Sequence, residues 1–157
     1  NLEKWRVPFE VNVLGTLRLT QQVIPLMKQL GGGSIVMINS MVIRDVLPTM
    51  ADYAASKAAL MAATQGLARE LGPSQIRVNS VVPGYIWGPS LQWYFADQAK
   101  RRGITPQQVY DEVAAGTALR HLPTSEEIAP AVVFFASDLS RVITGQSLDV
   151  NGGHIFK

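Results

Sequence analysis

The chain has 157 residues, 47% hydrophobic and 17% charged, which is the composition of a globular domain and excludes a disordered chain. Its formal net charge of +2 is too small to predict a nucleic-acid partner. The 157 residues contain no cysteine, so they form no disulfide or thiolate metal site, and His121 and His154 lack metal-ligand spacing. No apolar run approaches the about 20 residues that cross a bilayer, and we expect a cytoplasmic protein with no membrane partner.

The first predicted element is a helix from about Pro8 to Leu30, because proline suits the first turn of a helix. Pro25 should bend this helix or end its regular part early. The glycines 31–33 come next, before a strand. A phosphate cradle requires the order strand, glycines and then a helix N-terminus, so this run is interpreted as a stop and turn.

Three short strands are predicted along the chain. The first lies in Gly33–Ser40, the second in Ile76–Gly84 with a Pro-Gly break at its end, and the third in Thr144–Gly153 with a following turn. Open α/β sheets bind their ligands at the carboxyl ends of parallel strands. Ser40, at the end of the first strand, is therefore a candidate site residue.

A second helix is predicted from about Ala51 to Leu71, with Tyr53 and Lys57 near its start. Residues four apart on a helix stack on one face. The phenol of an isolated tyrosine has a pKa of about 10, and a nearby cation favours the phenolate. Such a pair suits proton transfer to or from a carbonyl or alcohol oxygen. By itself, however, it is more often a half-buried aromatic beside a solvated charge.

Residues 85–123 differ from the rest of the chain. Five of its twelve aromatic residues lie within positions 85–95, and Thr105 with Gln108 forms a capping box that starts a helix. The aromatics either cover a substrate or pack this insert onto the sheet or a neighbouring subunit. The basic run Lys100–Arg102 is interpreted as a solvated helix face. A last, buried helix is predicted to start at the capping box of Thr124.

Taken in order, these features resemble the short-chain dehydrogenase/reductase family in its single-domain form. The resemblance covers essentially the whole chain. The matching residues, in family order and at family-like spacing, are Asn12, Ser40, Tyr53, Lys57, Pro83, Gly84 and the segment 149–153.

The resemblance implies an α/β fold in which residues 1–157 form part of a Rossmann-type domain. The family's glycine-rich Thr-Gly-x-x-x-Gly-x-Gly turn and its Asn-Asn-Ala-Gly segment are absent from the sequence. We therefore expect the C-terminal half of a doubly wound parallel sheet, with residues 85–123 as a helical substrate lid. In the family the two long helices pair with their copies in a second subunit, which implies a homodimer or homotetramer.

The implied activity is hydride transfer between NAD or NADP and a small carbonyl or alcohol substrate. Tyr53 would be the general acid and base, and Lys57 would favour its phenolate and hold the nicotinamide ribose. Ser40 would hydrogen-bond the substrate oxygen, and Asn12 would hold a water that links Lys57 to solvent.

The implied cofactor contacts are Tyr53 and Lys57 together with residues after the second strand. Pro83, Gly84 and Ile86 would border the nicotinamide, with the Ile86 backbone as a candidate for its carboxamide. Many family members have threonine or serine where this chain has Gly88, which puts one contact in doubt. No metal is expected. The residues that usually decide between NAD and NADP follow a strand that this sequence lacks.

Two alternatives stay open at this point. One is a non-catalytic or inactive fragment that keeps the active-site residues without the cofactor cradle. The other, less favoured, is a sugar-nucleotide epimerase or dehydratase, since those longer relatives share the Tyr-x-x-x-Lys pair but carry a C-terminal substrate domain.

Overall fold

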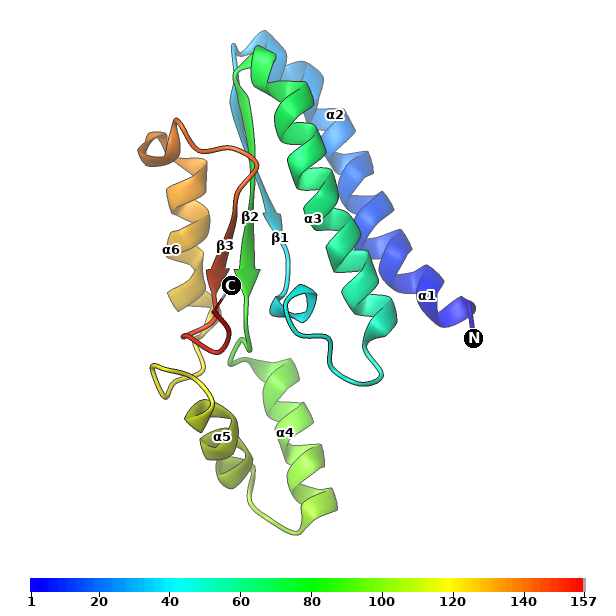
Figure 1. The fold of residues 1–157 in the computed structure, drawn as a ribbon, viewed down its shortest axis with the longest axis vertical. Helices are drawn as coiled ribbons and strands as arrows, with labels where there is room; N and C mark the ends of the chain where they lie inside the picture. Colours follow the sequence, from blue (N-terminus) through cyan, green and yellow to red (C-terminus); the bar gives the residue numbers. More distant parts are fainter. Residues whose placement is uncertain (157) are drawn as a thin grey trace.

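Three parallel strands form the centre of the fold in the computed structural model, which describes residues 1–156 (Figure 1). They are β1 (Gly33–Ile38), β2 (Ile76–Pro83) and β3 (Ser147–Val150), in the order β1-β2-β3. The central strand β2 is buried along nearly its whole length, as expected for a parallel strand covered on both faces. The predicted α/β fold with a parallel sheet is confirmed.

The first helix differs from the prediction at its start. It begins at Glu3, five residues before Pro8, and runs as α1 (Glu3–Pro8), a π-helical segment (Phe9–Gly15) and α2 (Thr16–Gln29). Pro8 is therefore the last residue of α1 and not the first turn of the helix. A proline within a helix removes one backbone hydrogen bond and crowds the preceding turn. The wider π segment follows directly after that disturbance.

The second proline, Pro25, does not end its helix early, because α2 continues through it to Gln29. Ile24 and Met27, on either side of it, pack against the buried cluster that α3 and the sheet form. Tertiary packing of this apolar face offsets the hydrogen bond that proline cannot make.

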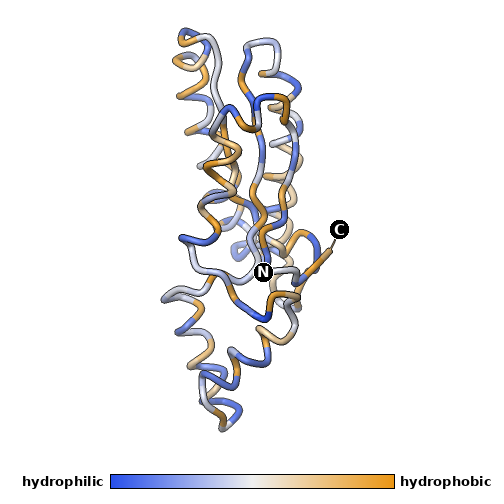
Figure 2. Tube along the Cα trace, turned by 90° about the vertical axis from the view of Figure 1, so that its left-hand side faces the viewer, coloured by the Kyte–Doolittle hydropathy of each residue, from blue (hydrophilic) through white to orange (hydrophobic). Residues whose placement is uncertain are grey.

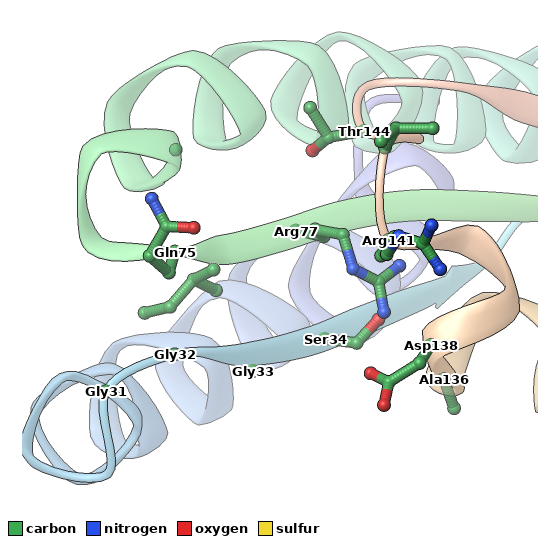
Figure 3. A pocket seen from close by; sticks show the side chains of 13 residues that line it. Gly31, Gly32, Gly33, Ser34, Gln75, Arg77, Ala136, Asp138, Arg141 and Thr144 are labelled. Atoms are coloured by element: carbon green, nitrogen blue, oxygen red, sulfur yellow. The ribbon is translucent and has the colours of Figure 1, made fainter.

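The glycine run ends this helix and turns the chain into β1, as the sequence indicated. Gly31 and Gly32 have φ values of 81° and 145°, which side chains rarely adopt. A Cβ on Gly32 would lie 2.6 Å from the carbonyl oxygen of Gln75. The run lies at the amino ends of the strands, lining a hollow with Arg77 and Arg141 (Figure 3).

Helix α3 (Ala51–Leu71) has the predicted bounds and packs against β2 on the same face of the sheet as α2 (Figure 1). Its buried residues Leu60, Ala68 and Leu71 join Met37 and Val78 in one core cluster. Short 3-10 turns lie before and after this helix, at Met41–Ile43 and Gly72–Ser74.

The insert forms a helical hairpin of α4 (Pro89–Arg102) and α5 (Pro106–Ala115), which extends beyond the sheet (Figures 1 and 2). The capping box of Thr105 and Gln108 is present, as predicted. The hairpin has its own core around Phe95 and Val109, and Trp87 packs against it. Most aromatics of this region therefore pack the insert itself, while Trp93 is 72% exposed.

The basic run on α4 lies at the end of the hairpin, with exposed side chains. Arg101 pairs with Asp97 at 2.8 Å, and Arg102 pairs with Glu112 at 2.7 Å. These pairs fit the interpretation of a solvated helix face.

Helix α6 (Ser125–Ala136) covers the other face of the sheet and starts at the predicted capping box of Thr124. A 3-10 turn at Asp138–Ser140 follows it. Arg77 of β2 ties this end of α6 to the sheet. Its guanidinium donates to the carbonyl oxygens of Phe135 at 2.9 Å and Ser137 at 3.0 Å, and to the Ser140 hydroxyl at 2.7 Å.

Within residues 1–156, no helix is both long and apolar enough to cross a membrane. The same residues contain no group of three or more histidine or carboxylate side chains that could hold a metal ion. The expected cytoplasmic location stays a prediction.

Arg77→Met should lower the free energy of unfolding by about 2 kcal/mol, because it leaves buried acceptors at the end of α6 without their charged donor. Arg141→Met, at an exposed position beside the same hollow, is the control and should change stability by less than about 0.5 kcal/mol. Urea unfolding followed by circular dichroism measures both. Equal effects of the two substitutions would contradict the role of the Arg77 hydrogen bonds in holding the end of α6 to the sheet.

Candidate active site

The candidate site lies at the carboxyl edge of the sheet. Because the three strands are parallel, the segments that follow Ile38, Pro83 and Val150 all emerge at this edge. Ser40 follows β1, Gly84 follows β2 and Asn151 follows β3. The fold thus brings together residues that are more than a hundred positions apart in the sequence.

Ser40 is held by its neighbours in an extended backbone conformation, with φ −157° and ψ 146°. Its amide donates to the Asn39 side chain at 3.0 Å, and its hydroxyl oxygen accepts from the Val42 amide at 3.3 Å. Because Oγ is the acceptor in that bond, the hydroxyl proton is left for a ligand oxygen.

Tyr53 and Lys57 lie on the same face of α3, as their spacing predicted. The Lys57 Nζ atom is 5.8 Å from the centroid of the Tyr53 ring, within the range of a cation–π contact. Nζ also donates to the carbonyl oxygen of Ile38 at 2.8 Å. The ammonium therefore joins the first turns of α3 to the end of β1. Burial lowers the pKa of Lys57 below its ordinary value, because removal from water disfavours the charged form.

Asn12 lies in the π-helical segment and contacts α3. Its Nδ2 atom donates to the Ser56 hydroxyl at 3.0 Å, and that hydroxyl donates to the carbonyl oxygen of Tyr53 at 2.7 Å. The fold thus connects Asn12 with the turn of helix that carries Tyr53 and Lys57. Short π-helical segments occur frequently at functional sites. The water relay expected for Asn12 stays a prediction.

Ser40 and Tyr53 line one pocket of about 180 Å³. Asp45, Tyr85 and His154 supply its other polar side chains. The remaining lining residues are apolar or glycine: Met41, Val42, Leu47, Met50, Gly84 and Ile155. A small apolar pocket with a few converging polar groups is the usual form of a small-molecule site.

The expected cofactor residues after β2 take different positions around this edge. Pro83 is buried as the last residue of β2, and Gly84 packs so closely that a Cβ would lie 2.8 Å from the Cβ of Asn151. The Ile86 side chain packs against Val81 of β2 and Ile128 of α6. Its backbone groups are therefore the part of Ile86 that is left for contact with a cofactor. The cofactor roles of all three stay predictions.

Sequence reasoning missed three polar residues of the pocket, Asp45, Tyr85 and His154. Tyr85 was grouped with the lid aromatics, and His154 was considered only as a metal ligand. His154 reaches the pocket because Asn151 closes a turn. The Oδ1 atom of Asn151 accepts from the amides of Gly153 at 2.9 Å and His154 at 3.1 Å. The available signal was position, since each residue follows shortly after a strand.

These two rings contact each other edge to face, with centroids 5.6 Å apart. Burial, with Tyr94 and then Asp45 adding negative charge, raises the pKa of the Tyr85 phenol. A phenol with a raised pKa stays protonated at neutral pH and can donate a hydrogen bond.

Comparison with known protein sequences gives the same assignment along nearly the whole chain. A family model described as Enoyl-(Acyl carrier protein) reductase matches residues 1–154. The chain is 39% identical to the (3R)-3-hydroxyacyl-CoA dehydrogenase of Rattus norvegicus, over 96% of this chain and 54% of that protein. It is 35% identical to a 3-oxoacyl-(acyl-carrier-protein) reductase of Thermotoga maritima, over 98% of this chain and 58% of that protein.

Solved structures agree with the fold. The L-sorbose reductase of Gluconobacter frateurii, solved with NADPH and L-sorbose, superimposes with a TM-score of 0.93 at 29% identity. That match covers 99% of this chain and 59% of the other.

A gluconate 5-dehydrogenase from Burkholderia cenocepacia, solved with NADP and tartrate, gives a TM-score of 0.86 at 28% identity, over 98% of this chain and 57% of the other. The chain spans little more than half the length of these relatives. The sequence match, the parallel sheet and the positions of Ser40, Tyr53 and Lys57 lead to one conclusion: the chain belongs to the short-chain dehydrogenase/reductase family.

Proposed function

We propose that these 157 residues carry the proton-handling side of an NAD- or NADP-dependent oxidoreductase that interconverts a small carbonyl compound and its alcohol. The observation that carries this proposal is the shared pocket of Ser40 and Tyr53, with Lys57 beside the tyrosine ring. Two hydroxyl groups at one small apolar pocket suit a single carbonyl oxygen, because each can donate a hydrogen bond to it.

Each residue has a distinct task in the reaction. Tyr53 gives its phenolic proton to the carbonyl oxygen during reduction and takes it back during oxidation. Ser40 donates a hydrogen bond to the same oxygen and stabilises the negative charge that develops there. Lys57 favours the phenolate that remains after proton transfer. Asn12, linked to this turn of α3 through Ser56, supports the path by which the proton is replaced.

The residues present fit one end of a nicotinamide cofactor. The Lys57 ammonium and the Tyr53 hydroxyl offer donors that suit ribose hydroxyls, and Pro83, Gly84 and Ile86 lie along the edge where the nicotinamide would bind. When bound, the cofactor supplies or accepts the hydride at the substrate carbon. No strand–glycine–helix cradle for its phosphates occurs in the described residues.

Residues 85–123 are proposed to act as a lid on this site. The α4–α5 hairpin has its own core, so it can move as one unit, and Tyr85 at its base lines the pocket. Lid closure would exclude water from the reacting groups.

Tyr53→Phe should reduce turnover by a factor of about 10² to 10⁴ while leaving the fold intact, because only the proton donor is lost. Reduction of a panel of small ketones with NADH or NADPH, by the longest natural polypeptide that contains these residues, measures the effect. Tyr94→Phe, at an exposed position on α4, is the matched control and should keep full turnover. Unchanged turnover in the Tyr53 variant would refute the assignment.

A second candidate function is that of a non-catalytic fragment, because no strand–glycine–helix cradle for the cofactor phosphates occurs in the described residues. The isolated 157-residue chain should not bind reduced nicotinamide cofactor at micromolar concentration, because the phosphate cradle is missing from its described part. A fluorescence titration, with circular dichroism to verify that the chain is folded, tests this expectation. Micromolar binding by the folded chain would overturn it.

We further propose a homodimer or homotetramer in which the first helix pairs with its copy. Val7, Val11 and Leu14 lie within eight residues of this helix and are 65%, 64% and 44% exposed. Large exposed apolar side chains grouped on one element suit an interaction surface.

Val11→Glu should shift the protein towards monomer, because it places a charge in that apolar interface. Size-exclusion chromatography with light scattering measures the assembly state. Gln107→Glu, on the exposed side of α5, is the control and should leave the assembly unchanged. A Val11→Glu protein with the wild-type mass would argue against this interface.

A further inference from the structure

The pocket carries a second pair of polar groups, on Tyr85 and His154, that the proton transfer does not use. We propose that His154, together with Tyr85, binds a hydroxyl group of the substrate, so that the enzyme prefers small uncharged hydroxyketones. This inference rests on the proposed carbonyl reductase function and names the substrate class of the same pocket.

The imidazole of His154 has one nitrogen available to a ligand. Its Nδ1 atom is buried and has no hydrogen-bond partner. A neutral imidazole carries one N–H group, and placing that proton on Nδ1 would bury a donor without an acceptor. Leaving Nδ1 unprotonated would instead bury an acceptor without a donor, so Nδ1 lacks a partner in either tautomer. Nε2 donates to a ligand hydroxyl in one tautomer and accepts from it in the other.

Two contacts hold this ring at the pocket. The backbone amide of His154 donates to the Asn151 side chain. The imidazole packs against the Tyr85 ring in a T-shaped contact, with the centroids 5.6 Å apart and an interplanar angle of 79°. Among the described residues, no hydrogen bond engages the Tyr85 hydroxyl or the His154 ring. Both groups thus remain available for a substrate oxygen.

The charge of the pocket selects against an acidic substrate. Asp45 is the lining residue with a formal charge, and neither lysine nor arginine lines the pocket. A carboxylate would lie near this aspartate without a cationic partner, which costs free energy. A hydroxyl group can instead accept from His154 or Tyr85 and donate to an oxygen, so an uncharged polar substrate is matched.

The size of the pocket suits a small substrate. Its volume is about 180 Å³, which corresponds to roughly six water-sized groups at about 30 Å³ each. A four-carbon hydroxyketone such as 3-hydroxy-2-butanone has this size. Compared with 2-butanone it differs by one hydroxyl, and compared with acetoacetate it lacks the charge.

The test compares kcat/KM for these three ketones in the longest natural polypeptide that contains the chain. The wild type should prefer 3-hydroxy-2-butanone over 2-butanone by about tenfold, the usual effect of one neutral hydrogen bond, and should reduce acetoacetate more slowly. His154→Phe keeps the ring and should abolish this preference. His154→Gln keeps a donor and should retain most of it, whereas His121→Phe, outside the pocket, should leave it unchanged.

An unchanged preference in His154→Phe, or a wild type that prefers acetoacetate, would overturn the inference. If the wild type reduces none of the three ketones, the carbonyl reductase function fails and His154 is tested by binding alone. In that case the ¹⁵N resonances of the His154 ring should shift with 3-hydroxy-2-butanone and not with 2-butanone. The absence of a selective shift would refute the role of His154.

Discussion

All three strands run in the same direction, and the location of the candidate site follows from this constraint. Parallel register places the ends of β1, β2 and β3 at one edge, so the chain leaves the sheet three times at the same place. Ser40 comes from the first exit, Tyr85 from the second and His154 from the third. The helix α3 adds Tyr53 to the same pocket. The parallel pairing of the strands is therefore sufficient to bring Ser40, Tyr85 and His154 to the same edge of the sheet.

Lys57 connects the sheet with the candidate site residue Tyr53. Its bond to the carbonyl oxygen of Ile38 joins α3 to β1, and its charge lies beside the Tyr53 ring. Burial lowers its pKa, because removal from water disfavours the charged ammonium. Groups with shifted pKa values are found more often at functional sites than elsewhere. One side chain thus joins α3 to the end of β1 and places a positive charge beside the Tyr53 ring.

Local pattern predicted much of the fold, because the relevant signals are short-range. The bounds of α3 and the capping boxes of Thr105 and Thr124 were correct, since alanine content and cap residues act within one helical turn. The predicted helix start at Pro8 was wrong, and the helix does not end early at Pro25. A local rule places proline at a helix end, but packing against the sheet and α3 keeps the helix continuous through both positions.

The sequence by itself determined the family, the strand–helix order and the candidate residues Ser40, Tyr53 and Lys57, because these depend on residue type and spacing. Only the tertiary structure decided what surrounds them. His154 and Tyr85 are 69 positions apart in the chain, and nothing in their spacing predicts that their rings meet. The parallel sheet and the Asn151 turn bring them together, because side-chain contacts across a fold depend on the path of the backbone and not on local pattern.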